Sequence, residues 1–341
     1  MKKIIQAGLL LTLLLTLLAA CGNNNDTPTA DAQQPAGSSS NNDNSNNTNN
    51  NENNDATDDR ADWPSKFIFG ILPTEDQAEL AKRFDGMNEY LEAELGIDVE
   101  LFYGTSYTAL IEAMANGHLH ASSFGPFSYL IANERANGEA FAIPVNVEGG
   151  TLDDIFYYAQ MITLEETGVD SLADIEGKSL AYADPASTSG HLFPKAMLIN
   201  ELGLTMDNVD DFPSQVVFSG SHEASLYSIL NGDVDTAGVC STCIERVFER
   251  VNDHPNFDQL KVFHESEPIP GGPYVIQGDL PQSFKTAVAE AFYNMINDEV
   301  GKQFLIDNEY LGGFIPISHE EYQVVQDTAD ALNMSPEELL K

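Results

Sequence analysis

Short β-rich runs alternate with amphipathic segments along most of this chain, and this alternation constrains the fold more than any other feature. A strand is predicted at Lys66–Leu72, and apolar positions near helical spacing follow over Glu75–Leu95. A strand at Asp98–Tyr103 and a helix at Tyr107–Ala115 continue the pattern. Alternating strands and helices indicate α/β lobes with mainly parallel sheets.

The same alternation extends to about residue 308 and supplies enough elements for one large or two medium lobes. Further strands are predicted at His120–Phe124, Phe141–Val147, Ile155–Thr163, Ser179–Ala183, Gln215–Phe218, Thr236–Val239, Leu260–His264 and Tyr274–Ile276. Further helices are predicted at Phe127–Asn137, His191–Leu202, His222–Asn231, Ser241–Arg250, Gln282–Ile296 and Gly301–Asn308, with a helical turn at Leu172–Ile175. The sequence shows no internal repeat and no second apolar stretch of membrane-spanning length.

The N-terminus has the pattern of an export signal. Lys2 and Lys3 precede an apolar run, Ile4–Leu18, that is too short to span a bilayer comfortably. Small residues then lead into Cys21, and this segment resembles a bacterial lipobox. The resemblance implies a lipoprotein signal peptide at residues 1–20 and a diacylglycerol, with acyl chains such as palmitate, on the Cys21 thiol. The alternative is an ordinary signal peptide that leaves Cys21 as a free thiol.

Residues 21–62 are predicted to form a disordered tether. Beyond Cys21 this segment is rich in Asn, Asp, Ser, Thr, Gly and Pro, and its first basic residue is Arg60. A segment with so few large apolar side chains cannot bury enough surface to offset the entropy that is lost on ordering. A flexible coil of this length has a reach on the order of 35 Å, enough to hold a folded part clear of a membrane.

The acidic balance of the chain excludes some partners. Asp and Glu number 54 against 15 Lys and Arg, which gives a formal net charge of −39. Nucleic acids and anionic lipid surfaces bind positively charged patches, so neither is expected as a partner. Apart from Cys21 the chain has only Cys240 and Cys243, so disulfides do not build this fold.

One segment indicates an anion site. The predicted strand Ser179–Ala183 runs through Asp184-Pro-Ala into three consecutive hydroxyl residues, Ser187, Thr188 and Ser189, before a glycine and the next helix. Free backbone N–H groups at a helix start attract anions, and hydroxyl groups can donate to oxyanion oxygens. Helix capping alone is the alternative, because Ser and Thr are favoured caps. The pattern of a nucleotide P-loop is absent, and we expect no cofactor.

That segment resembles the Asp-Pro-x-Ser-Thr-Ser-Gly signature of the phosphonate-binding (PhnD-like) periplasmic receptors of ABC transporters. Other matching segments occur in order at Tyr107–Met114, Phe124–Pro126, Ala132–Gly138, Ser219–Glu223 and Pro268–Pro273. The resemblance covers nearly all of residues 66–310. It implies an α/β fold of the type II periplasmic-binding-protein kind, with a hinge of crossing strands and a ligand cleft between two lobes. Lobe 1 would comprise residues 63–158 and 266–341, and lobe 2 residues 159–265.

The resemblance also implies a function and a site. A small phosphorus oxyanion (phosphonate, phosphite or phosphate) would be captured on the extracytoplasmic face of the membrane for an ABC transporter permease and ATPase complex. The hydroxyls and amides of Ser187, Thr188 and Ser189 would hold the ligand oxygens, with Tyr107 and His222 closing the cage. Such a site uses helix starts and hydroxyls rather than positive side chains. We expect a monomeric binding protein that is anchored to the membrane only through its lipid, and not an enzyme.

Three departures from the family's pattern, and one neighbouring lysine, bear on the site. Relatives that take aminoalkylphosphonates place acidic residues near the ammonium group, where this chain has Gly272 and Thr242. We therefore expect a ligand without an amine. Phe124 stands at a site position where many relatives carry Tyr, so one hydroxyl contact passes to water or to Tyr129. Lys195 lies about two helical turns beyond the hydroxyl residues and is expected to face solvent.

The segment Cys240-Ser-Thr-Cys243 leaves other functions open. At a helix start this pair is typical of a thioredoxin-like redox motif, so a lipid-anchored thiol–disulfide oxidoreductase is the alternative among enzymes. Two buried thiols or a local structural disulfide are simpler interpretations. A zinc site would need a second ligand pair at suitable spacing, so no metal is expected. A receptor that senses its ligand and signals to a membrane kinase is a third hypothesis.

Overall fold

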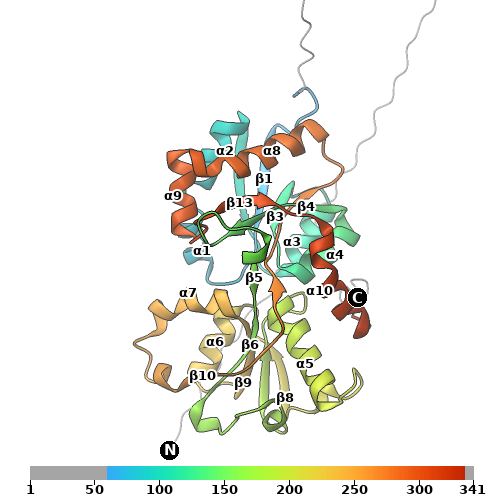
Figure 1. The fold of residues 1–341 in the computed structure, drawn as a ribbon, viewed down its shortest axis with the longest axis vertical. Helices are drawn as coiled ribbons and strands as arrows, with labels where there is room; N and C mark the ends of the chain where they lie inside the picture. The colour runs from blue at the N-terminus through green and yellow to red at the C-terminus, as the bar shows by residue number, and fades with distance from the viewer. Residues whose placement is uncertain (1–59, 335–341) are drawn as a thin grey trace, which may run out of the picture. The chain divides into compact units, whose positions relative to one another are not determined.

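Two mixed β-sheets, each covered by helices, form the fold of the computed structural model (Figure 1). The structure describes residues 60–334. The predicted signal peptide at 1–20, the lipid site at Cys21 and the tether up to residue 59 therefore lie outside the described residues. Within the described part, no helix is both long enough and apolar enough to cross a membrane.

Six strands in the order β13-β4-β12-β3-β1-β2 form the sheet of lobe 1. They are β1 (Lys66–Ile71), β2 (Asp98–Tyr103), β3 (Ala121–Ser123), β4 (Gly138–Val145), β12 (Tyr274–Gln277) and β13 (Gly313–Pro316). β1 pairs in parallel with β2 and β3, whereas β12 and β13 run antiparallel to their neighbours. Alternate residues of β1, namely Phe67, Phe69 and Ile71, are buried in the core.

Five strands in the order β10-β6-β9-β7-β8 form the sheet of lobe 2. They are β6 (Ala159–Leu164), β7 (Ser179–Tyr182), β8 (Gln215–Phe218), β9 (Thr236–Cys240) and β10 (Leu260–Glu265). β7 is parallel to β8 and β9, and β6 is antiparallel to β9 and β10. The prediction of mainly parallel sheets is therefore wrong. In each lobe one strand enters from the hinge and another returns to it, and the two run in opposite directions. These strands are β6 and β10 in lobe 2, and β12 and β4 in lobe 1.

Two short antiparallel strands, β5 (Phe156–Tyr157) and β11 (Ile269–Pro270), lie between the sheets and form the hinge (Figure 1). The Gly271 N–H extends their pairing by donating to the Ile155 carbonyl at 2.9 Å. The predicted strand over residues 155–163 is thus divided between the hinge and lobe 2. The predicted two-lobe α/β fold with crossing hinge strands is confirmed.

Ten α-helices in the described part cover the two sheets. Lobe 1 carries α1 (Gln77–Arg83), α2 (Met87–Leu95), α3 (Tyr107–Ala115), α4 (Pro126–Ala136), α8 (Gln282–Asn294), α9 (Glu299–Asp307) and α10 (Gln323–Ala331). Lobe 2 carries α5 (Phe193–Leu202), α6 (His222–Leu230) and α7 (Ser241–Val251), and a π-helical turn at Thr188–Leu192 leads into α5. Strand β13 and helix α10 were not predicted from the sequence.

The predicted helix over Glu75–Leu95 is divided into α1 and α2. Gly86 lies between them with a φ of 83°, a left-handed conformation that glycine adopts without steric cost. Met87 and Leu91 of the second helix are nevertheless fully buried, so the apolar periodicity survives the interruption. As a consequence, Arg83 is the last residue of α1 instead of a position inside a long helix.

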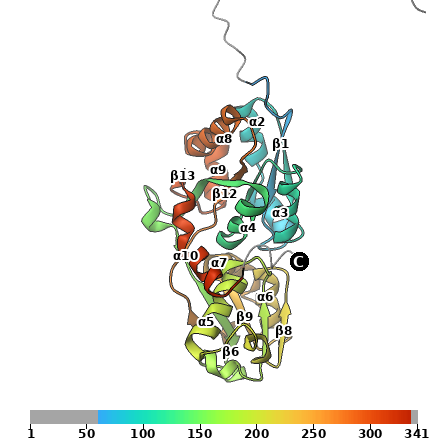
Figure 2. The same ribbon diagram turned by 90° about the vertical axis from the view of Figure 1, so that its right-hand side faces the viewer.

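Helix α10 lies beside α4 and reaches the π-helical turn of lobe 2 (Figure 2). Buried side chains of both lobes therefore belong to one continuous apolar cluster, which includes Tyr322 and Val325 from the C-terminal segment and Leu192 and Phe193 from lobe 2. Each lobe also has an apolar cluster of its own. The two lobes are thus in direct contact beside their hinge.

Candidate functional site

A cavity of about 190 Å³ lies between the two lobes. It is lined by all six residues that the sequence predicted as ligand contacts: Ser187, Thr188, Ser189, Tyr107, His222 and Phe124. These six residues are buried. The structure therefore brings them together from both lobes, while their contact with a ligand stays a prediction.

Helix N-termini converge on this cavity. α3, α4, α6 and α7 contribute lining residues from their first turns, namely Tyr107, Pro126, His222 and Thr242, and the π-helical turn contributes Thr188. The first backbone N–H groups of a helix have no partners within the helix and carry partial positive charge. Several such ends around one cavity favour a bound anion.

The hydroxyl groups of Ser187 and Thr188 are positioned as donors. Ser187 Oγ accepts a hydrogen bond from the Gly190 N–H at 3.0 Å. Thr188 Oγ1 accepts one from the Phe127 N–H, across the interface between the lobes, at 2.8 Å. Because a hydroxyl also carries one proton, each of these groups can still donate to a ligand oxygen.

His222 offers a neutral N–H donor. Its Nδ1 accepts a hydrogen bond from the Cys240 N–H at 3.1 Å, which assigns the proton of the neutral ring to Nε2. Nε2 lies 3.4 Å from Ser187 Oγ. Burial, with the positive charge of Arg246 as a second cause, lowers the pKa of His222 from 6.5 to about 3. His222 is therefore uncharged at neutral pH and contributes a hydrogen bond instead of a charge.

Two tyrosine hydroxyls lie beside these donors. Burial raises the pKa of Tyr107 well above its usual value, against the opposing effect of a hydrogen bond with Ser187. Burial raises the pKa of Tyr157 to about 12, against hydrogen bonds with Ser189 and Thr188. Both phenols therefore stay protonated and can donate. Sequence reasoning missed Tyr157, because only the pairing of β5 with β11 brings it to the cavity.

A further part of the cavity, which we call the arginine end, is lined by Arg83, Arg246 and Tyr274, which interact electrostatically with one another. Gly272 and Thr242, the positions without the expected carboxylates, also line the cavity. A side chain at position 272 would not fit, since a Cβ there would lie 2.3 Å from a backbone carbonyl oxygen. Sequence reasoning missed both arginines, while the prediction that hydroxyls and helix starts hold the anion stays a prediction.

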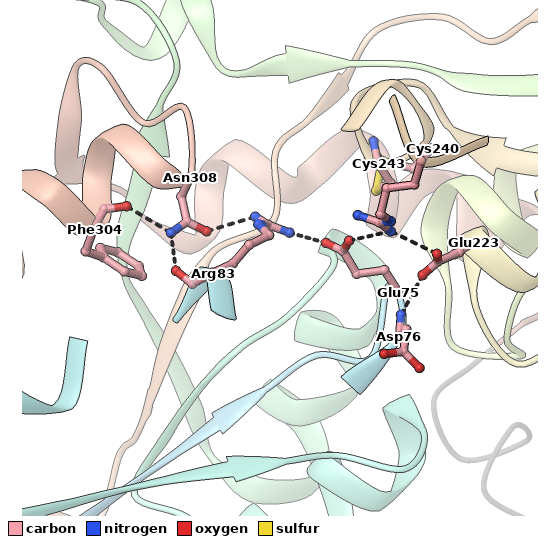
Figure 3. A network of polar contacts seen from close by, with 9 residues as sticks. Glu75, Asp76, Arg83, Glu223, Cys240, Cys243, Phe304 and Asn308 are labelled. Atoms are coloured by element: carbon pink, nitrogen blue, oxygen red, sulfur yellow. Dashed lines mark hydrogen bonds and ion pairs between the residues drawn. A yellow bond between two sulfur atoms is a disulfide. The ribbon is translucent and has the colours of Figure 1, made fainter. Parts of the chain in front are cut away.

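Arg83 is part of a network of polar contacts (Figure 3). Glu75 accepts hydrogen bonds from Arg83 and from Arg250, and Glu223 accepts one from Arg250 at 2.8 Å. Asn308 accepts a hydrogen bond from Arg83 Nη2 at 2.9 Å. Glu75 and Arg83 belong to lobe 1, whereas Arg250 and Glu223 belong to lobe 2, so this network joins the lobes.

Two sequence-based expectations about neighbouring residues are wrong. Lys195 is only 6 % exposed and its Nζ donates to Asp210 at 3.0 Å. The π-helical turn that precedes α5 holds one residue more than an α-helical turn. Lys195 therefore lies on a different face of the helix from the one that regular α-helical spacing predicts. Tyr129 does not replace the hydroxyl missing at Phe124, because it lies outside the cavity lining and bonds to His319 Nδ1 at 2.9 Å.

Cys240 and Cys243 form a disulfide in the first turn of α7, and both residues line the cavity. Cys240 is the N-cap of this helix, and its Sγ accepts a hydrogen bond from the Cys243 N–H at 3.1 Å. Of the interpretations that the sequence left open for this cysteine pair, the structure contains the local disulfide. Among the residues described, no three His, Cys, Asp or Glu side chains are grouped so as to hold a metal ion.

Comparisons with known sequences identify one family. The family model described as "ABC transporter, phosphonate, periplasmic substrate-binding protein" matches residues 69–322. The phosphate-import protein PhnD of Mycolicibacterium smegmatis is 27% identical to this chain over 280 residues, which cover 79% of this chain and 86% of the relative.

Two solved structures share the fold. A binding protein component of an ABC phosphonate transporter from Pseudomonas aeruginosa has a TM-score of 0.69 at 23% identity, covering 77% of this chain and 85% of that chain. PhnD1 from Prochlorococcus marinus, solved in complex with methylphosphonate, has a TM-score of 0.69 at 21% identity, covering 79% and 99%. At these identities the similarity establishes the two-lobe fold alone.

Proposed function

The chain belongs to the periplasmic substrate-binding proteins of phosphonate ABC transporters, and from this premise we propose that its cavity captures a small phosphorus oxyanion without an amine. Members of this family are binding proteins and not enzymes, which disfavours the thiol–disulfide oxidoreductase. One observation carries the proposal: neutral hydrogen-bond donors, namely the hydroxyls of Ser187 and Thr188 and the Nε2–H of His222, line a single cavity.

These donors suit the chemistry of a phosphoryl group. A phosphonate or phosphite presents several oxygens that accept hydrogen bonds and share a negative charge. Each hydrogen bond from a neutral donor to such a charged group contributes about 1.5–3 kcal/mol. Two hydroxyls, one imidazole N–H, two phenols and the helix N-termini supply these bonds in a buried cavity, where water competes little.

A ligand amine would meet more positive than negative side chains in this cavity. Asp154 is the carboxylate among the described lining residues, and its Oδ2 already accepts a hydrogen bond from the Thr151 N–H at 2.9 Å. Arg83 and Arg246 would repel an ammonium group at short range. Phosphite, phosphate, methylphosphonate and similar anions therefore fit better than aminoalkylphosphonates.

Replacing Ser187 and Thr188 together by Ala tests the placement of the site. Two charge-assisted hydrogen bonds would be lost, so the affinity for methylphosphonate should fall by a factor of about one hundred or more. Titration calorimetry on the purified full chain measures this, and circular dichroism checks the fold of the variant. The exposed pair Ser214→Ala with Thr205→Ala is the matched control. An unchanged affinity in the first variant would show that the ligand binds elsewhere.

We also propose that a lipid on Cys21 anchors the protein to the extracytoplasmic face of the membrane, where it delivers its ligand to a permease and ATPase complex. The lipobox-like residues before Cys21 and the family support this proposal. In the host cell, Cys21→Ser should move the protein from the membrane fraction to the soluble extracytoplasmic fraction. Retention of the variant with the membrane, as for the wild type, would count against lipidation.

A further inference from the structure

The arginine end carries donors that a simple phosphorus oxyanion does not use. In the described part of the chain, five buried side-chain nitrogen or oxygen atoms have no hydrogen-bond partner. Two of them, Arg83 Nε and Arg246 Nε, belong to residues at the arginine end of the cavity. Buried donors without partners are unfavourable, so their concentration at one end of a ligand cavity indicates that a ligand group binds there.

Among the described residues, Arg246 has no ion-pair partner at the arginine end. Glu75 pairs with Arg83 and Arg250, and Glu223 pairs with Arg250 at 2.8 Å. Within residues 60–334, Arg246 makes no ion pair with either carboxylate. Glu75 and Glu223 are thus paired with Arg83 and Arg250, and in the part of the chain that the structure describes Arg246 is left without an ion pair.

The neighbours of Arg246 indicate where its guanidinium group lies in the cavity. Arg246 lies four residues after Thr242 on α7, so both side chains project from the face of the helix that lines the cavity. Its positive charge contributes to the low pKa of His222, which places Arg246 within electrostatic reach of the phosphoryl-binding donors. Burial and the neighbouring Arg83 lower the pKa of Arg246, and the attraction of Glu75 and of the exposed Glu309 offsets this only in part.

We infer that the natural ligand is a phosphonocarboxylate, whose phosphonate group binds at the helix N-termini and whose carboxylate binds Arg246 at the arginine end. This inference rests on the proposed function and names the substrate class of the same site. A guanidinium group can donate two parallel hydrogen bonds to a carboxylate. The one unpaired guanidinium group of Arg246 matches one carboxylate, whereas a second phosphoryl group would bring close to two negative charges.

Titration calorimetry on the full chain tests this with matched ligands. Phosphonoacetate carries a carboxylate where ethylphosphonate carries a methyl group, so the ratio of their affinities isolates the carboxylate. We expect phosphonoacetate to bind at least about tenfold more tightly than ethylphosphonate to the wild type. Arg246→Gln should reduce this ratio to near one, and Arg135→Gln, at an exposed ion pair, should leave it unchanged. Arg246→Lys keeps the charge without the planar fork and should give an intermediate ratio.

The possible results distinguish the inference of a phosphonocarboxylate ligand from the proposed function, the capture of a phosphorus oxyanion. Equal affinities of phosphonoacetate and ethylphosphonate in the wild type would overturn the inference, while tight methylphosphonate binding would leave the proposed function in place. Failure to bind any phosphorus oxyanion would overturn the proposed function itself. Tighter binding of methylenediphosphonate than of phosphonoacetate would contradict a carboxylate as the second group. If Arg246→Gln does not fold, the ratio of phosphonoacetate to ethylphosphonate affinity in the wild type and in Arg246→Lys still tests the inference.

Discussion

At position 222, a backbone N–H determines the chemistry of a side chain. The Cys240 N–H donates to His222 Nδ1, so the ring can act as a donor only through Nε2. A glycine makes room for the ring, because a Cβ at Gly190 would lie 2.9 Å from His222 Cε1 and 2.8 Å from Ser187 Oγ. The glycine that follows the three hydroxyl residues is therefore explained by packing against the donors of the site.

Two buried histidines predict how the stability of the protein depends on pH. Burial is the largest cause of the low pKa values of both side chains. The pKa is about 4 for His191 and about 3 for His222, compared with 6.5 for histidine in the unfolded chain. Between pH 6.5 and 4 the unfolded state therefore binds more protons than the folded state. The free energy of unfolding should fall as the pH is lowered through this window, by up to about 1.4 kcal/mol per pH unit for each histidine.

Urea unfolding at a series of pH values, comparing the wild type with His191→Asn, isolates one of these contributions. Asn keeps a donor near the Pro185 carbonyl, which now lies 2.8 Å from His191 Nδ1, but it does not titrate. The variant should lose less stability than the wild type between pH 6.5 and 4. Replacing the exposed His118 by Gln is the matched control. Parallel curves for the wild type and His191→Asn would show that His191 is not held neutral by burial.

At the scale of elements, the sequence predicted what regular periodicity reveals and missed what depends on tertiary contacts. Helix α3 was predicted with its observed bounds, Tyr107–Ala115, because its apolar spacing and its N-cap lie in one local segment. Strand β11 and helix α10 escaped prediction because they are short or weakly apolar and are defined by what they pack against. The π-helical turn at Thr188–Leu192 has no periodic signal, yet it decides that Lys195 is buried.

The same distinction applies to the site. The hydroxyl residues and the helix starts could be predicted, because one continuous segment of sequence encodes them. Tyr157, Arg83 and Arg246 could not be predicted in this way. Tyr157 comes from the hinge, Arg83 from the last position of α1, and Arg246 from a helix of the other lobe. Each is a common residue type that becomes informative only through its surroundings.

At the scale of the whole folded part, both lobes contribute to the cavity, and polar contacts join them on its two sides. The Phe127 N–H of lobe 1 donates to Thr188 Oγ1 of lobe 2. On the other side, Arg250 of lobe 2 donates to Glu75 of lobe 1 at 3.0 Å. We therefore expect the proposed donors to be assembled only when the lobes are in contact, and ligand binding to be coupled to closure about the β5–β11 hinge.

The central claim is that this closed cavity selects a phosphorus oxyanion that has no amine. Titration calorimetry of the full chain with methylphosphonate and 2-aminoethylphosphonate tests it most directly, because the two ligands share the phosphonate and differ in the ammonium group. Repulsion from Arg83 and Arg246 predicts that methylphosphonate binds at least about tenfold more tightly. Tighter binding of 2-aminoethylphosphonate would contradict the account.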